Sequence, residues 1–213
     1  MKDELKDLLD LLDLEQIEVN MFRGVSPSEG WQRVYGGQVI GQSLVAASRT
    51  VEDCRRVAHS LHGYFLRPGD TKIPILYSVD RIRDGSSFNT RRVVAVQEGH
   101  AIFSMSVSFQ VIERGLHHQI DMPKNVKPPE KCATENELRE KYRDQIPEEF
   151  KSQLERPRPI EMRFVEPVND FHPEPAAPRQ LVWIKASDKM PTDIRLNQCL
   201  LAYASDMTLL DTC

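Results

Sequence analysis

Residues 101–112, Ala-Ile-Phe-Ser-Met-Ser-Val-Ser-Phe-Gln-Val-Ile, alternate between apolar and polar side chains. From the third residue of this stretch onward, every second position is apolar, and these positions are Phe103, Met105, Val107, Phe109 and Val111. Because successive side chains of a strand point to opposite faces of a sheet, a period of two predicts a strand with one buried face and one polar face. The stretch therefore predicts a sheet that covers an apolar core on one side only.

Further segments of strand-like composition come before this stretch. They are residues 17–25, 58–66, 73–82 and 87–97. Two tight turn sequences, Asp84-Gly85 and Glu98-Gly99, separate the last of these from its neighbours. Connections this short join adjacent antiparallel strands, so we expect an antiparallel meander.

A helix is expected between the first strand and the meander. It opens at Tyr35-Gly36-Gly37-Gln38 and continues to about residue 51, with an apolar stripe of Ile40, Leu44, Ala47 and Val51. Small residues between these positions keep the helix slim, which lets it approach a neighbouring backbone closely. A sheet with one apolar face must pack that face against another element, and this helix is the local element that can cover it. The predicted fold class is α+β, and a curved antiparallel sheet wrapped round one helix is a hotdog fold.

The remaining sequence predicts a second, incomplete unit. Residues 113–158 are rich in Pro, Lys and Glu and read as a linker, in which Thr134 and Glu137 form a capping box for a helix over 135–145. Two strands and an apolar helix then repeat the earlier order, at residues 160–167, 180–186 and 195–210. A shift of 156 positions places Gln42, Leu44 and Ala46 on Gln198, Leu200 and Ala202, which suggests an internal duplication.

These segments divide the chain into three expected parts. Residues 1–112 hold an N-terminal amphipathic helix, with Leu5, Leu8, Leu9 and Leu12 on one face, and the first hotdog unit. Residues 113–158 form the linker, and residues 159–213 begin a second hotdog unit. No meander follows the second helix before Cys213, so we expect this unit to be cut short.

Composition and charge exclude several function classes. The 213 residues are 40% hydrophobic and 28% charged, and the formal net charge is −4 without a basic stripe, so no nucleic-acid partner is expected. The four cysteines form no CxxC pair, which argues against a zinc site or a disulfide framework and for reduced thiols in the cytoplasm. The N-terminus is too acidic for a signal peptide, and no apolar run approaches the roughly 20 residues of a membrane span.

Asp206 is the strongest catalytic candidate. Its neighbours at three and four positions along the expected helix are Ala202, Tyr203, Leu209 and Leu210, a stripe that should be buried. Burial raises the pKa of a carboxyl group, and such a group can orient or deprotonate a water molecule. The alternative is a solvated acid at a fraying helix end.

The sequence offers weaker evidence for the other candidate residues. His59 and His62 lie three apart on an expected strand, so their side chains should point to opposite faces and share no metal ion, and structural histidines are the simpler interpretation. A histidine facing the helix would be a possible base. Ser43 lies inside the expected helix, not on a nucleophile elbow. Gly36-Gly37 at a helix start could present N–H groups to a carbonyl oxygen or a phosphate, or form an ordinary helix start.

Several motifs together resemble the acyl-CoA thioesterase II family. They include Phe22-Arg23-Gly24, Tyr35-Gly36-Gly37-Gln38-Val39, residues 59–70 (His-Ser-Leu-His-Gly-Tyr-Phe-Leu-Arg-Pro-Gly-Asp), Arg83-Asp84-Gly85-Ser86-Ser87-Phe88, Arg91-Arg92-Val93, Val182-Trp183-Ile184 and residues 201–206 (Leu-Ala-Tyr-Ala-Ser-Asp). The resemblance implies two hotdog units in one chain and hydrolysis of fatty acyl-CoA to a free fatty acid and CoA without a metal or other cofactor. It implies an acyl-CoA substrate, assembly as a homo-oligomer and catalysis by an aspartate on the second hotdog helix, to which Asp206 corresponds.

Two alternatives stay open at this point. The Ser or Thr and the Gln that assist the aspartate in that family have no counterpart in residues 1–213, so the chain could be a catalytically silent fragment or an acyl-CoA-binding module. A hotdog hydratase or dehydratase would place an Asp and a His together, but no histidine neighbours Asp206 in the sequence. Release of free CoA would separate hydrolysis from a change at the acyl β-carbon.

Overall fold

The computed structural model describes residues 1–27, 33–148, 151, 156–169, 171–172 and 174–209. The chain forms two compact units, which we describe separately. The hotdog unit comprises residues 7–115 and 190–207, and the small-sheet unit comprises residues 1–6, 116–189 and 208–213.

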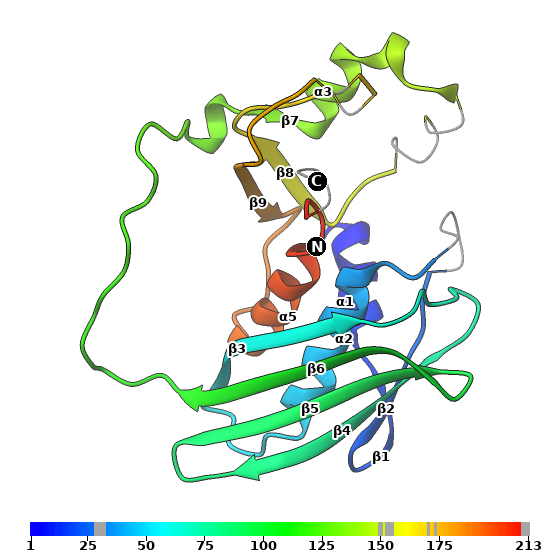
Figure 1. The fold of residues 1–213 in the computed structure, drawn as a ribbon, viewed down its shortest axis with the longest axis vertical. Coiled ribbons are helices and arrows are strands. Elements are labelled where there is room, and N and C mark those ends of the chain that lie inside the picture. Colours follow the sequence, from blue (N-terminus) through cyan, green and yellow to red (C-terminus); the bar gives the residue numbers. More distant parts are fainter. Residues whose placement is uncertain (28–32, 149–150, 152–155, 170, 173, 210–213) are drawn as a thin grey trace. The chain divides into compact units, whose positions relative to one another are not determined.

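The hotdog unit is built on a six-stranded antiparallel sheet with the order β1-β2-β4-β5-β6-β3 (Figure 1). The strands are β1 (Glu15–Glu18), β2 (Met21–Gly24), β3 (Arg56–Phe65), β4 (Ile75–Asp84), β5 (Phe88–Gln97) and β6 (His100–Val111). The expected meander is present. The single strand expected over 17–25 is wrong: it is split into β1 and β2 by a turn at Val19-Asn20, and asparagine favours such turns.

The turn between β5 and β6 has the geometry that its residues predict. Glu98 and Gly99 have φ angles of 49° and 78°, which match the left-handed pair of a two-residue hairpin. Such a turn twists in the same sense as the strands it joins, and it sets Gln97 opposite His100. A β-bulge between Ala95 and Val96 then shifts the register by one residue, which sets Val93 opposite Met105.

The helix α2 (Gly36–Arg49) lies against one face of this sheet (Figure 1). Phe103, Met105, Val107 and Phe109 of β6 are all buried, whereas Ser106 between them is exposed. The alternation in the sequence therefore reports the two faces of the sheet correctly. Most of α2 is buried as well, including the polar side chains of Gln38, Gln42, Ser43 and Ser48.

The second helix of the hotdog unit, α5 (Ile194–Ala204), packs beside α2 (Figure 1). A Cβ on Gly41 of α2 would lie 3.3 Å from the carbonyl oxygen of Cys199, so the small residue allows the two helix backbones to come close. Arg195, in the first turn of α5, donates hydrogen bonds to the carbonyl oxygens of Ser48 and Val51. These bonds tie the start of α5 to the C-terminal end of α2 and to the residues that follow it.

The helix α1 (Asp3–Leu12) precedes the sheet, and its residues from Asp7 onward belong to the hotdog unit. Leu8 and Leu12, from the predicted apolar stripe, are buried. The Leu12 side chain packs at Gly41, where a Cβ would come within 3.1 Å of its Cδ2.

The small-sheet unit contains three short antiparallel strands in the order β7-β8-β9. They are β7 (Ala133–Thr134), β8 (Ile160–Phe164) and β9 (Val182–Ala186). The predicted capping box is formed, because the Thr134 hydroxyl accepts from Glu137 N–H and the Glu137 carboxylate accepts from Thr134 N–H, and it starts α3 (Glu135–Lys141). Two 3₁₀ turns, η1 (Pro129–Lys131) and η2 (Arg143–Gln145), flank this segment, and α3 is shorter than the helix expected over 135–145. None of the helices in the described part of the chain combines the length and the apolar content that crossing a bilayer requires.

Candidate active site at the start of α2

Asp206 lies in the hotdog unit, two residues beyond the end of α5. The helix expected to run to residue 210 ends at Ala204, and Ser205 and Asp206 form a turn. This turn brings the half-buried Asp206 side chain to the first residues of α2, where its carboxylate accepts a hydrogen bond from Gly37 N–H. The carboxylate therefore lies at the N-terminal end of one helix and not inside the C-terminal half of another.

Two adjacent glycines make this approach possible. A Cβ on Gly36 would lie 2.5 Å from Asp206 Oδ2, and a Cβ on Gly37 would lie 2.2 Å from the carbonyl oxygen of Tyr203. Both distances are far shorter than real Cβ contacts. Only residues without a side chain allow the turn after α5 to sit this close to the helix start.

The surroundings of Asp206 pull its pKa in opposite directions. Desolvation by burial raises the pKa above the ordinary value of 3.8, and the hydrogen bond from Gly37 N–H lowers it by a smaller amount. The net effect is a raised pKa, which makes the carboxylate a stronger base than an exposed aspartate. The N-terminal end of α2 also carries a partial positive charge that favours the ionised form.

Tyr35 and Tyr203 hold the turn against the helix start. The Tyr35 hydroxyl donates to the Tyr203 carbonyl oxygen at 3.0 Å, and the two rings meet edge to face with centroids 5.1 Å apart. In the sequence, Tyr35 is visible only as part of a motif, and this role was not predicted. A tyrosine beside two glycines at a helix start was the available signal.

Phe65, the last residue of β3, completes the surroundings of the carboxylate. A Cβ on Gly36 would lie 2.7 Å from Phe65 Cζ as well as 2.5 Å from Asp206 Oδ2, so these two atoms are no farther apart than the sum of those distances. The Phe65 ring packs on Phe103 with centroids 5.0 Å apart. Sequence reasoning also missed Phe65, since nothing local links residue 65 to residue 206.

The two candidate histidines lie elsewhere on the sheet. His59 Nε2 is 2.9 Å from the Ser108 hydroxyl oxygen, and the His62 ring packs on the Tyr64 ring at 4.7 Å. Both histidines are exposed on the face of the sheet that points away from α2, so the prediction of opposite faces is wrong. A β-bulge between Ala58 and Ser60 shifts the alternation by one residue. Neither histidine faces the helix as a base would.

The nucleophilic side chains of the helices are not available for chemistry. Ser43 is fully buried in α2. Burial raises the pKa of the Cys199 thiol to about 12, which keeps it protonated and unreactive. Within the described residues, no three His, Cys, Asp or Glu side chains are placed to hold a metal ion together.

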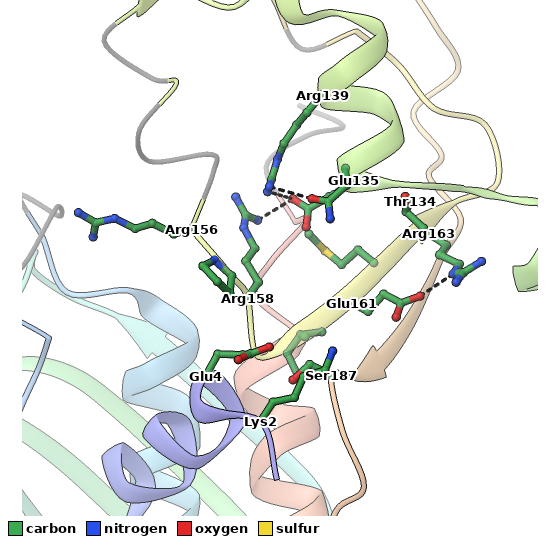
Figure 2. A pocket seen from close by; sticks show the side chains of 14 residues that line it. Lys2, Glu4, Thr134, Glu135, Arg139, Arg156, Arg158, Glu161, Arg163 and Ser187 are labelled. Atoms are coloured by element: carbon green, nitrogen blue, oxygen red, sulfur yellow. Dashed lines mark hydrogen bonds and ion pairs between the residues drawn. The ribbon is translucent and has the colours of Figure 1, made fainter.

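The small-sheet unit has a cavity of its own, of about 410 Å³ (Figure 2). Its most prominent charges compensate each other. Figure 2 shows Arg139 and Arg158 pointing at the Glu135 carboxylate, with N–O distances of 3.3 Å and 2.8 Å. Arg163 pairs with Glu161 at 2.6 Å. Asp206 does not line this cavity. The residues that line it are Lys2, Glu4, Thr134, Glu135, Asn136, Arg139, Arg156, Pro157, Arg158, Ile160, Glu161, Met162, Arg163 and Ser187.

Two family models match the chain. Residues 27–110 match the acyl-CoA thioesterase N-terminal domain, and residues 149–213 match acyl-CoA thioesterase. The first match covers α2 and the meander, and the second covers the segment that carries Asp206.

Curated relatives match over nearly the whole chain. The chain is 40% identical to acyl-CoA thioesterase 2 of Haemophilus influenzae over 206 residues, which are 97% of this chain and 71% of the relative. It is 39% identical to acyl-coenzyme A thioesterase 8 of Mus musculus over 214 residues, which are 95% of this chain and 65% of the relative. The chain thus spans about two thirds to seven tenths of the length of these proteins.

Solved structures agree in sequence and in fold. The acyl-CoA thioesterase II TesB2 of Mycobacterium marinum is 42% identical with a TM-score of 0.73, and the match covers 96% of this chain and 70% of that one. A hot dog fold protein of Alicyclobacillus acidocaldarius, 16% identical with a TM-score of 0.68 over 94% of this chain and 68% of that one, supports the fold alone. The motifs, the hotdog architecture and the identity over nearly the whole chain lead to one conclusion: the chain belongs to the acyl-CoA thioesterase family.

Proposed function

We propose that this chain hydrolyses fatty acyl-CoA thioesters to a free fatty acid and CoA, with Asp206 as the group that activates water. The observation that carries the proposal is the position of Asp206. Its half-buried carboxylate has a raised pKa and is held by Gly37 N–H at the N-terminal end of α2. Family membership supplies the substrate class, and the relatives of Haemophilus influenzae and Mus musculus carry that activity in their names.

The proposed reaction needs one water molecule and one carboxylate. Asp206 accepts a proton from the water while the water oxygen bonds to the thioester carbonyl carbon. The tetrahedral intermediate then collapses, the carbon–sulfur bond breaks, and the protonated Asp206 returns the proton to the departing CoA sulfur. The products are the fatty acid and free CoA, and Asp206 is again ionised.

Two features of the hotdog unit support this chemistry. The partial positive charge at the N-terminal end of α2 stabilises negative charge that develops on the carbonyl oxygen close to Gly37. A raised pKa brings Asp206 closer to the pH at which it works, so that the group both accepts and returns a proton.

The decisive experiment compares the 213-residue chain with its Asp206→Asn and Asp206→Ala variants. Release of free CoA from palmitoyl-CoA is followed with a thiol reagent. We expect each substitution to lower turnover by at least about 100-fold, the scale of lost general-base catalysis. Near-normal hydrolysis by Asp206→Asn would refute the role of Asp206. Binding of palmitoyl-CoA without any turnover by the unsubstituted chain would favour the acyl-CoA-binding module instead.

We also propose that the chain acts in the cytoplasm and as a homo-oligomer. The free thiols of Cys54, Cys132 and Cys199 support a reducing compartment. The sheet order leaves β3 at an edge of the sheet, where backbone groups are open to pairing with a second copy. Light scattering during size-exclusion chromatography tests the assembly, and a monomer at micromolar concentration would contradict it.

A further inference from the structure

The cavity of the small-sheet unit has more basic than acidic side chains in its lining. Five basic residues line it against three acidic ones, and the basic ones are Lys2, Arg139, Arg156, Arg158 and Arg163. The ion pairs within the lining therefore leave an excess of positive charge. A cavity lined mainly by one sign of charge attracts a small ion of the opposite sign.

Two of the guanidinium groups share a single carboxylate oxygen. Arg139 Nη2 and Arg158 Nη1 lie 3.3 Å and 2.8 Å from the same atom, Glu135 Oε1 (Figure 2). The side chains of Arg139 and Glu135 are each only 19% exposed, so solvent screens this cluster in part. Burial lowers the pKa of Arg139, and the positive charge of Arg158 lowers it further. The three side chains keep one net positive charge, which a second anion would balance.

Ser187 brings a hydrogen-bonding group to the same cavity. Its side chain belongs to the lining, and its hydroxyl oxygen is buried without a hydrogen-bond partner among the described residues. Its backbone N–H, in contrast, donates to the Pro159 carbonyl oxygen at 2.9 Å, so the residue is fixed in place. A buried hydroxyl without a partner is unfavourable, and a polar ligand atom in the cavity would satisfy it.

The cavity also has an apolar part. Ile160 and Met162 are two residues apart on β8, so their side chains share one face of the strand, and both line the cavity together with Pro157. The volume of about 410 Å³ is within the range of small-molecule sites in proteins. A ligand that fits this lining combines a compact anionic group with an organic body of low polarity.

We infer that this cavity binds a small organic phosphate, with the phosphate group against Arg139 and Arg158 and the organic body against Ile160 and Met162. A phosphate monoester carries a charge of about −1.5 to −2 at pH 7, which matches the excess positive charge better than a carboxylate does. Guanidinium groups bind phosphate through paired, charge-assisted hydrogen bonds. The inference goes beyond the proposed function and does not depend on the role of Asp206.

The test compares two variants of the cavity with one matched control. Arg158→Gln removes one of the two cations while Arg139 still balances Glu135, so the thermal melt should stay close to that of the unsubstituted chain. Ser187→Ala removes only the unpartnered hydroxyl, so its melt should not fall. The control, Arg143→Gln, removes the same charge from an exposed ion pair of the same unit that lies outside the lining.

Binding is measured by calorimetry with adenosine 5′-monophosphate (AMP) and with adenosine, which lacks the phosphate group. We expect adenosine to bind at least about tenfold more weakly than AMP, because the charge-assisted hydrogen bonds are absent. Arg158→Gln should weaken AMP by at least about tenfold, and Ser187→Ala should weaken it by about threefold through the loss of one neutral hydrogen bond. Arg143→Gln should leave AMP binding unchanged.

The natural phosphate could come from a free nucleotide or from the nucleotide part of CoA, and a competition experiment separates the two. It uses the thioether analogue of octanoyl-CoA, which cannot be hydrolysed. If the cavity takes the nucleotide part of CoA, the analogue displaces AMP, and Arg158→Gln weakens the analogue as well. If the cavity takes a free nucleotide, AMP binds equally with and without the analogue. Both results support an organic phosphate site.

Three outcomes would overturn the inference. They are the absence of AMP binding at about 1 mM, equal binding of adenosine and AMP, and equal weakening by Arg158→Gln and Arg143→Gln. The catalytic proposal is judged separately by turnover of Asp206→Asn. If that variant is inactive and AMP does not bind, the cavity site falls and the role of Asp206 stands. If it stays active and AMP binds as expected, the reverse holds.

Discussion

The backbone N–H of Gly37 donates a hydrogen bond to the carboxylate of Asp206. These residues are 169 positions apart in the sequence. The bond joins the first turn of α2 to the turn that follows α5, and it places the acid where a helix dipole favours its ionised form.

The pH dependence of hydrolysis should report the raised pKa of Asp206. Only the ionised carboxylate accepts a proton from water, so kcat/KM should fall as the pH drops through a value above the ordinary 3.8. Phe65→Ala admits water beside the carboxylate, which lowers its pKa and moves this limb to lower pH. The measurement is kcat/KM for octanoyl-CoA across the acid range, and a limb that Phe65→Ala leaves in place would contradict the assignment.

The stability of the chain should respond to the same group. Because the pKa of Asp206 is raised on folding, the folded state binds this proton more tightly than the unfolded state does. The contribution of Asp206 to the free energy of unfolding is largest below pH 3.8, the ordinary pKa, and it is lost as the pH rises through the pKa of the folded state. The side-chain amide of the Asp206→Asn variant does not titrate, so the variant does not lose this stabilisation. The difference in urea midpoint, variant minus unsubstituted chain, should therefore increase from pH 4 to pH 7.

Asp53 provides a control of opposite sign. Its pKa is lowered to about 2, chiefly by the hydrogen bond from the Arg55 side chain. The ionised Asp53 stabilises the folded state above pH 3.8, and this stabilisation is lost as the pH falls towards the folded-state pKa of about 2. Asp53→Asn should therefore lose urea midpoint relative to the unsubstituted chain as the pH rises from 2 to 4, where the stabilising effect of Asp53 develops. A variant whose midpoint keeps pace with that of the unsubstituted chain over this range would contradict the assignment.

Gly37→Ala should destabilise the hotdog unit. The new Cβ would meet the Tyr203 carbonyl oxygen at 2.2 Å, and this backbone atom of α5 gives way only if the helix moves. Overpacking of this kind costs about 1–3 kcal/mol of unfolding free energy. Urea denaturation measures it, with Gly115→Ala as the control, since a Cβ on Gly115 meets nothing within 4 Å.

Gly36→Ala should instead affect catalysis more than stability. Its Cβ would meet Asp206 Oδ2 and the Phe65 ring, which are the far ends of side chains and can rotate away. The fold survives, but the carboxylate is displaced by about the 1 Å that costs on the order of 100-fold in rate. Turnover of palmitoyl-CoA together with a thermal melt separates the two effects, and a variant with full activity would count against the site.

Adjacent arginines of β5 should differ sharply in their effect on stability. The buried Arg91 donates to Thr50 Oγ1, to the Thr50 carbonyl oxygen and to Asp84, at 2.8, 3.0 and 2.6 Å. Arg91→Met leaves buried acceptors without donors, which costs about 1–3 kcal/mol. Arg92 is half-exposed and pairs with Asp80 in solvent, so Arg92→Met should cost less than about 1 kcal/mol. Comparable losses from the two variants, measured in urea, would refute the difference.

Much of the fold could be predicted from local signals. The alternation over 101–112, the Glu98-Gly99 turn and the small residues of the helix at 36–49 each depend on residues close in sequence. Side-chain periodicity and turn chemistry act over a few residues, so the sequence displays them directly. The same holds for the Thr134–Glu137 capping box, which spans one helical turn.

The sequence predicted only part of the candidate site. Asp206 stood out as an acid among apolar neighbours, but the end of α5 at Ala204 and the position of the carboxylate beside Gly37 were not foreseen. The bulge after Ala58 likewise turned His59 and His62 to one face, although strand alternation predicts two. Both features arise from pairing with distant residues, which no local period records.

The sequence by itself determined that the chain forms a hotdog sheet around a slim helix and that residue 206 is an unusual acid. Only the tertiary structure decided what surrounds that acid. Gly36, Gly37 and Phe65 reach Asp206 from elements far away in the chain, because α5 packs beside α2 and β3 ends next to the start of α2. Burial and hydrogen bonding are properties of these long-range contacts, and they set the pKa on which the proposed chemistry depends.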